Sequence, residues 1–267
     1  MGPEISVRFG FYPDGKRKAV TFSYDDARVE DRRLAELFRT YGAKATFHIN
    51  ASNLGRVNFL DAGEIKELFA GHEIASHGLT HPWLERLPPE SFAYEILEDR
   101  RRLEALCGYP VRGLSYPWGT CNDEVVAGIR ALGIRYARTI QSSNQFHLPE
   151  NFLRWNPTCH HNADLMSRVE PFRNARPLSL FYVWGHSFEF TRDGNWDMMS
   201  RFCEALALMN DVWFATNIEI YDYITALRGV SLSVDRSMAC NPSGTDVWLE
   251  VNGDAVRVPA GQTVYLE

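Results

Sequence analysis

The sequence has no run of about 18 apolar residues, the length that a helix needs to cross a bilayer, so we expect no membrane span. Residues 1–5 lack a basic region followed by an apolar one, and no signal peptide is visible. The net charge of −6 argues against nucleic acid or an anionic membrane surface as a partner. We therefore expect a cytoplasmic protein, or an extracellular one if a leader was removed.

Cysteine is scarce and scattered. A disulfide framework or a cysteine-rich zinc site needs several cysteines at paired spacings. The five cysteines here are an odd number without such spacing, so we expect reduced thiols. They are Cys107, Cys121, Cys159, Cys203 and Cys240.

Apolar residues make up 45% of the 267 positions, which is typical of an ordinary globular core. This length suits one barrel-sized domain with an appendage, or two small domains. Strand and helix patterns alternate, which indicates crossover units and a parallel sheet. We predict a closed or nearly closed barrel of about seven parallel strands rather than an open doubly wound sheet. The expected strands are 19–24, 44–49, 73–75, 111–116, 135–140, 152–156, 178–184 and 212–216, and the expected helices are 30–41, 62–70, 88–106, 122–132, 164–169, 196–209 and 219–227.

The pattern changes near Gly229, where helical periodicity stops. Alternating segments follow, and Asn252-Gly253 between two of them is typical of a β-hairpin. We predict a barrel over residues 1–228 and a small β appendage over residues 229–267. The appendage is interpreted as structural, with sugar binding or oligomerisation as open alternatives.

Two histidines four positions apart, His77 and His81, follow a short apolar run. Pro82 disfavours helical geometry at His81, so a loop or a single turn is expected there. Two imidazoles are too few to hold a metal such as zinc, which needs a third ligand. Asp25-Asp26 at the end of the strand 19–24 offers that ligand, although such a pair also occurs in solvated turns and helix caps. Sites in α/β folds lie at this edge of the sheet.

Two motifs resemble those of the polysaccharide deacetylases, the family-four carbohydrate esterases that include chitin and peptidoglycan deacetylases. They are residues 21–26 (Thr-Phe-Ser-Tyr-Asp-Asp) and residues 71–81, which contain the two histidines. The resemblance covers roughly residues 17–228 and implies a seven-stranded distorted barrel. It also implies one divalent metal, usually zinc, held by Asp26, His77 and His81, with Asp25 as the catalytic base.

His186 follows the strand 178–184 at a position similar to the family's last motif, and it is the candidate general acid. An imidazole suits that role at neutral pH. Glu189 is a candidate to tune it. The tetrahedral oxyanion needs a donor such as a backbone N–H near Tyr116.

Residues 115–119 (Ser-Tyr-Pro-Trp-Gly) resemble the third motif, in which an arginine that pairs with the base usually stands at the position of Ser115. Arg112 and Arg154 are candidates to replace that arginine. Gly78 stands where a serine or threonine usually braces the histidine loop, and Ser76 is the candidate substitute.

Aromatic side chains near these motifs are candidates to contact a sugar ring or an acetyl methyl group. The predicted substrate-binding residues are Tyr116, Pro117, Trp118 and Trp184. Trp155 lies where the fourth motif is expected, with a poor match. His48 and His72 are interpreted as structural. His160 and His161 are another possible pair, but adjacent residues on a strand point to opposite faces and cannot easily share one metal, so they are interpreted as a solvated turn.

The leading hypothesis is a metal-dependent hydrolase that removes N-acetyl groups from N-acetylated sugars, such as chitin- or peptidoglycan-type oligomers. A relative that opens small cyclic amides or imides, sometimes without metal, is the first alternative. A non-catalytic carbohydrate-binding protein on the same scaffold is the second, and an iron oxygenase is a third. The intact ligand set and the retention of Asp25 and His186 favour the hydrolase. The substrate, the metal and the oligomeric state stay open.

Overall fold

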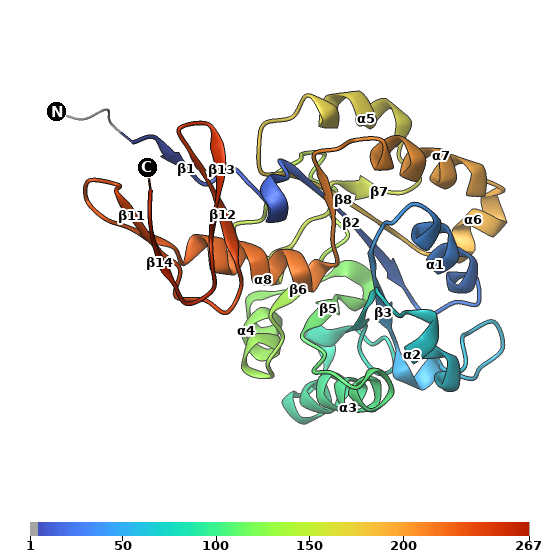
Figure 1. Cartoon of the computed structure of the whole chain (residues 1–267). Coiled ribbons are helices and arrows are strands. Elements are labelled where there is room, and N and C mark those ends of the chain that lie inside the picture. The colour runs from blue at the N-terminus through green and yellow to red at the C-terminus, as the bar shows by residue number, and fades with distance from the viewer. Residues whose placement is uncertain (1–4, 267) are drawn as a thin grey trace.

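A computed structural model describes residues 5–266. Its centre is a curled parallel sheet with the strand order β6-β5-β4-β3-β2-β8-β7, and β9 also pairs with β2 (Figure 1). This arrangement confirms the distorted (β/α) barrel. The strands are β2 (Lys18–Asp25), β3 (Ala45–Ile49), β4 (Glu73–Ser76), β5 (Gly113–Ser115), β6 (Tyr136–Arg138), β7 (Cys159–His160), β8 (Ser179–Gly185) and β9 (Val212–Phe214).

The prediction of a strand over residues 152–156 is wrong, because these residues do not form an extended strand. Phe152–Arg154 is a single 3₁₀ turn, and Trp155 alone forms a bridge with Arg138. The chain then crosses the gap between the two ends of the sheet. The Trp155 N–H donates to Ala137 of β6 at 3.0 Å, and the Thr158 N–H donates to Tyr182 of β8 at 2.8 Å. These bonds satisfy the backbone where the barrel would otherwise stay open.

Helices cover the outside of the sheet (Figure 1). Asn122 accepts a hydrogen bond from the Val125 N–H, and Asp61 and Glu64 form a reciprocal capping box, as the sequence predicts. The short helix α6 was not predicted. The helices are α1 (Asp31–Thr40), α2 (Ile65–Leu68), α3 (Pro89–Cys107), α4 (Asp123–Ala131), α5 (Met166–Arg173), α6 (Phe188–Asp193), α7 (Trp196–Ala207) and α8 (Asn217–Arg228).

All eight residues of β2 are buried, because this strand pairs with β3, β8 and β9 and is covered by helices. Phe22 of β2 stacks on Phe38 of α1 with ring centroids 4.5 Å apart. Burying each such side chain contributes about 1.5–3 kcal/mol to folding. The apolar side chains therefore fix β2 at the centre of the barrel, and its last residue, Asp25, is held at the edge of the sheet.

The C-terminal appendage consists of two small antiparallel sheets beyond α8 (Figure 1). Asn252 and Gly253 have φ values of 52° and 100°, so the predicted hairpin is confirmed. The sequence did not predict that the N-terminal strand β1 pairs with β12. The sheets are β1-β12-β13 and β10-β11-β14, with β1 (Val7–Arg8), β10 (Ser231–Leu232), β11 (Met238–Cys240), β12 (Val247–Val251), β13 (Asp254–Val258) and β14 (Thr263–Tyr265).

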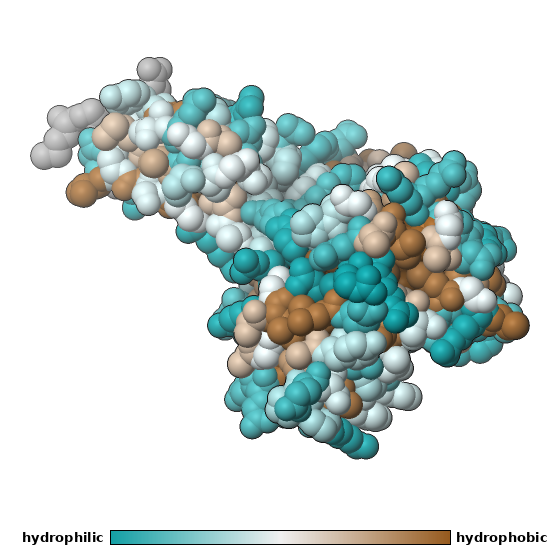
Figure 2. Space-filling model, turned by 90° about the horizontal axis from the view of Figure 1, so that it is seen from below, coloured by the Kyte–Doolittle hydropathy of each residue, from teal (hydrophilic) through white to brown (hydrophobic). Residues whose placement is uncertain are grey.

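The appendage shares a hydrophobic cluster with α8, which includes Leu249 from β12 and Tyr223 from the helix. Figure 2 shows it as a lobe that stands out from the barrel. The domain boundary at residue 229 stays a prediction. Within residues 5–266, every helix is too short or too polar to span a membrane. The prediction about a signal peptide falls largely on residues 1–4, outside the described part.

Candidate active site

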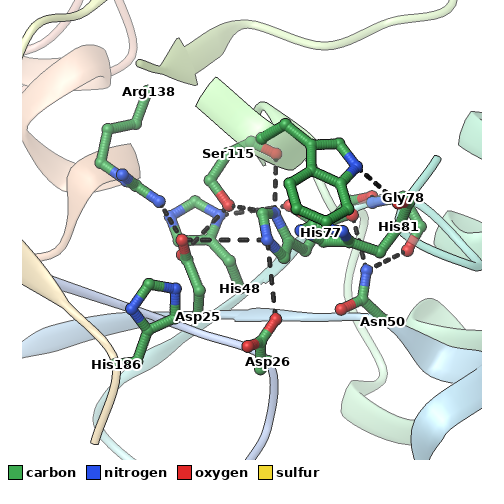
Figure 3. Close-up of polar contacts among 12 residues, drawn as sticks. Asp25, Asp26, His48, Asn50, His77, Gly78, His81, Ser115, Arg138 and His186 are labelled. Carbon is green, nitrogen blue, oxygen red and sulfur yellow. Dashed lines mark hydrogen bonds and ion pairs between the residues drawn. The ribbon is translucent and has the colours of Figure 1, made fainter. Parts of the chain in front are cut away.

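The polar residues singled out from the sequence gather where the parallel strands end (Figure 3). Asp25 ends β2, His77 follows β4, and His186 follows β8. They line a cleft of about 410 Å³. Its lining residues are Asp25, Asp26, His77, His81, Tyr116, Trp118, Gly119, Ile140, Trp184 and His186.

Asp26, His77 and His81 each offer a ligand atom within 4.8 Å of the others, so the structure brings the predicted triad together. His77 Nε2 lies 3.7 Å from Asp26 Oδ1. The other ring nitrogen of His77, Nδ1, lies 2.9 Å from the Ser115 carbonyl oxygen. Because a carbonyl only accepts hydrogen bonds, Nδ1 carries the proton, and the lone pair of Nε2 faces the carboxylates.

Strained backbone is concentrated around this triad. Asp26, Ala27, His81 and Trp118 have φ values of 83°, 57°, 61° and 62°, in a left-handed region that side chains other than glycine seldom adopt. Each such residue costs of order 1–3 kcal/mol and persists only where the surroundings enforce it. The strain indicates that the rest of the fold enforces the backbone geometry at this edge of the barrel.

Asp25 is buried beside Arg138, which is 0% exposed. The Arg138 guanidinium donates to Asp25 Oδ2, and the Ser115 hydroxyl donates to Oδ1 at 3.1 Å. Burial raises the pKa of Asp25, but the charge of Arg138 outweighs burial and holds the pKa well below its usual range. Asp25 is therefore an ionised carboxylate in the cleft.

The prediction that Arg112 or Arg154 replaces the family arginine is wrong. Arg112 pairs with Asp222 at 2.7 Å, and Arg154 pairs with Asp123. Arg138 takes the role instead, from the end of β6. The sequence placed Arg138 inside the expected strand 135–140, whereas β6 ends at this residue, so its position at the edge of the sheet was not visible in the sequence.

We expect Arg138→Met to destabilise the fold by about 3–5 kcal/mol, because it leaves the buried Asp25 carboxylate without its cation. Urea unfolding followed by circular dichroism measures this loss as a lower midpoint. Arg56→Met removes an exposed arginine as a matched control. Equal midpoints for Arg138→Met and the wild type would show that the pair does not hold this edge.

Ser76 braces the histidine loop, as predicted from the departure at Gly78. Its hydroxyl donates to Asp99 and accepts from the Gly78 N–H at 3.1 Å. Sequence analysis missed a second brace, Asn50, whose amide donates to the His77 and Gly78 carbonyl oxygens at 2.6 and 2.7 Å. Its position after β3 was the only available signal.

Trp118 forms the exposed wall of the cleft, with half of its surface open to solvent. Its ring stacks on Trp83 with centroids 5.2 Å apart and an interplanar angle of 4°. Trp184 is buried, and the Arg138 guanidinium lies 4.4 Å from its ring centroid. Trp155 is buried in the core and does not reach this wall.

Tyr116 and Pro117 differ from what was expected. Tyr116 lines the cleft, but its N–H donates to the Arg138 carbonyl at 3.0 Å and is not free for an oxyanion. Its hydroxyl donates to the Leu153 carbonyl. Among the described residues, those that line the cleft do not include Pro117. The Pro117 ring packs against Gly78 instead, and a Cβ atom on residue 78 would lie 3.3 Å from it.

His186 lies at the opposite side of the cleft from the loop that carries His77 and His81 (Figure 3). The ring atom Nδ1 of His186 lies 3.7 Å from Glu189 Oε2, and the backbone N–H of His186 donates to the same oxygen at 3.3 Å. Burial lowers the pKa of His186, but Glu189 and Asp25 outweigh burial and raise it above its ordinary value. The protonated form of His186 is therefore favoured more strongly than in an ordinary histidine.

The interpretation of His160-His161 as a solvated turn is wrong. β7 ends at His160, so the alternation of a strand does not apply, and the two ring centroids lie 4.4 Å apart. His161 is fully buried. His48 is also buried, and burial lowers its pKa to about 3, so it is neutral.

Comparison with known proteins agrees with this geometry. Residues 13–137 match the polysaccharide deacetylase family model. The peptidoglycan-N-acetylmuramic acid deacetylase PdaC of Bacillus subtilis is 26% identical over 114 residues, which are 42% of this chain and 24% of that protein. The chain thus spans about a quarter of the length of that relative.

Solved structures share the fold. A "putative polysaccharide deacetylase" from Mycobacterium smegmatis aligns with a TM-score of 0.65 and 18% identity, covering 84% of this chain and 96% of that one. A family 4 carbohydrate esterase from Streptomyces lividans aligns with a TM-score of 0.50 and 16% identity, covering 74% and 90%. The fold is therefore the distorted (β/α) barrel of the family-four carbohydrate esterases. The polysaccharide deacetylase family model matches residues 13–137, just under half of the chain, and this part carries the sequence likeness to the family.

Proposed function

We propose that this protein is a metal-dependent hydrolase that removes N-acetyl groups from N-acetylated carbohydrates. The observation that carries the proposal is the convergence of Asp26, His77 and His81 in a cleft that also holds an ionised Asp25. One carboxylate and two imidazoles are the ligand set of hydrolytic zinc sites, which keep an open position for water or substrate.

The residues fit a divalent metal. The Ser115 carbonyl fixes the tautomer of His77 so that Nε2 presents a lone pair, which is the usual outer support of a metal-binding imidazole. Burial lowers the pKa of His81, so its ring is neutral and able to bind a cation. Zinc is favoured by this donor set. A bound cation supplies Lewis-acid polarisation of the amide carbonyl and makes water more acidic.

The protein's own groups supply the proton transfers. Asp25 is placed to accept a proton from the attacking water, and Arg138 and Ser115 hold its carboxylate in position. His186 is placed to donate a proton to the leaving amine. With Nδ1 turned toward Glu189, its Nε2 is left for the substrate. Amide cleavage then yields acetate and the free amino sugar.

The two alternatives differ from this proposal in what they require. A cyclic amide hydrolase of this fold needs a closed pocket for a small ring, whereas Trp118 stands half exposed at a cleft wall. A binding protein on this scaffold needs no buried base paired with an arginine, yet Asp25 and Arg138 are both present. Carbohydrate is therefore the substrate class that we propose, and the compartment stays a prediction.

The direct test is acetate release from N-acetylglucosamine oligomers and from peptidoglycan fragments, with the new free amines counted in parallel. We expect equal amounts of acetate and amine, and their loss in His186→Gln by about 10²–10⁴-fold. A cyclic imide hydrolysed while both sugars stay intact would favour the alternative enzyme.

We expect Trp118→Ala to raise KM for N-acetylated oligomers about two- to tenfold, because it removes an aromatic face worth about 0.5–1.5 kcal/mol from the cleft wall. Steady-state kinetics on oligomers measures the change. Tyr265→Ala removes a more exposed aromatic ring from the appendage and is the control. If both variants keep the wild-type KM, Trp118 does not contact the sugar.

A further inference from the structure

A second group of potential ligands lies next to the cleft, outside the triad. His160, His161 and Glu189 each offer a ligand atom within 4.8 Å of the others. The Nε2 atoms of both imidazoles lie 3.1 Å from the same carboxylate oxygen, Glu189 Oε2. The residues come from the end of β7, the turn after it and the first turn of α6.

Hydrogen bonding does not account for His161. Its side chain is 0% exposed, and within residues 5–266 neither of its ring nitrogens has a hydrogen-bond partner. Glu189 Oε2 is near Nε2 but lies off the direction of a ring N–H bond. A buried polar atom without a partner costs about 1–3 kcal/mol. A cation between Nε2 and the carboxylate would satisfy both groups.

The fold makes room for this ring. A Cβ on Gly185 would lie 2.0 Å from His161 Nδ1, so any residue other than glycine would displace the imidazole. The ring packs against both Tyr24 and Phe190, with centroids 5.7 and 4.2 Å away. These contacts hold the ring in place with its Nε2 atom 3.1 Å from Glu189 Oε2.

We propose that His160, His161 and Glu189 form a second metal site, which binds a divalent transition ion of the zinc class. Two imidazoles and one carboxylate suit zinc better than calcium or magnesium, which prefer oxygen ligands. Three protein ligands leave a position open for water. The site adjoins the first through His186, which lines the cleft and also contacts Glu189.

The proposal has a local consequence at His160. In the structure the Asn162 N–H donates to His160 Nδ1 at 3.1 Å. A ring that binds an ion through Nε2 carries its proton on Nδ1, so this hydrogen bond must break on binding. Asn162 lies in an exposed turn, where its N–H can bond to water instead. The side chain of His160 is itself a quarter exposed, which gives the ion a path from solvent.

The experiment counts zinc on the full chain without a histidine tag. Bound metal is removed with a chelator, and the protein is then dialysed against zinc. The zinc bound per chain is measured by inductively coupled plasma mass spectrometry. The variants are His81→Gln for the first site, His160→Gln and Glu189→Gln for the second, and the double variant His81→Gln/His160→Gln. His147→Gln removes an exposed histidine as the matched control. Circular dichroism checks that each variant is folded.

We expect about two zinc ions per chain in the wild type and in His147→Gln, about one in each single-site variant, and none in the double variant. Cobalt loaded into His81→Gln should give the visible absorption of a low-coordinate site, and the double variant should not. Wild-type zinc content in folded His160→Gln and Glu189→Gln would overturn the second site. Zinc lost only in His81→Gln would do the same while leaving the proposed function intact.

Discussion

Replacing His77 with alanine will abolish zinc binding in the cleft and reduce deacetylation to background. His77 supplies one of three ligands, and the two that remain cannot hold the ion tightly. We expect the affinity for zinc in this site to fall by more than about 10³-fold, since each lost ligand removes several kcal/mol from a site of this kind. Competition with a chromophoric chelator, measured in a background of His160→Gln, reports this site alone.

Because His77 is buried and contacts Ser115, alanine could also loosen the loop. His81→Gln is the second variant, since His81 is only partly buried and its side chain has fewer contacts to lose. His147→Ala is the exposed control. Undiminished zinc affinity in folded His77→Ala and His81→Gln would show that the cluster is not the metal site.

Asp25→Asn will keep the metal and lose turnover. Asparagine has the shape of aspartate but cannot accept the proton of the attacking water, so kcat should fall by about 10²–10⁴-fold. Zinc content should stay at the wild-type level, because Asp25 is paired with Arg138 and Ser115 instead of belonging to the ligand triad. Metal analysis and acetate release on the same preparation separate these two outcomes.

The substitution also leaves the buried Arg138 guanidinium without its anion, and we expect a stability loss of about 3–5 kcal/mol. A retained metal content shows that the variant used for kinetics is folded. Asp254→Asn changes an exposed aspartate of the appendage and should leave both properties unaltered. Full turnover by Asp25→Asn would remove Asp25 from the role of base.

The sequence predicts what is encoded within a few neighbouring residues. The ends of two strands can be recognised in the sequence: the buried strand before Asp25-Asp26 and the short strand before His77. Parallel strands place their carboxyl ends at the same edge of the sheet. The Asn252-Gly253 turn was predictable for the same reason, since its backbone geometry depends on those two residues.

Contacts between distant strands were beyond such reasoning. Asp25 and Arg138 lie 113 positions apart, and their pairing depends on how β2 and β6 face each other across the barrel. The same applies to His161 and Glu189, which meet only because β7 ends and α6 begins at the same edge. The pairing of β1 with β12 joins residues 7–8 to residues 250–251 and has no local signal.

We propose that a metal held by Asp26, His77 and His81 activates the cleft for deacetylation. This dependence is measured as acetate release from N-acetylglucosamine oligomers by chelator-stripped protein as zinc is added back, in a background of His160→Gln. We predict that release stops on chelation and returns in full at about one zinc per chain. Undiminished acetate release by the metal-free protein would show that deacetylation does not depend on this metal.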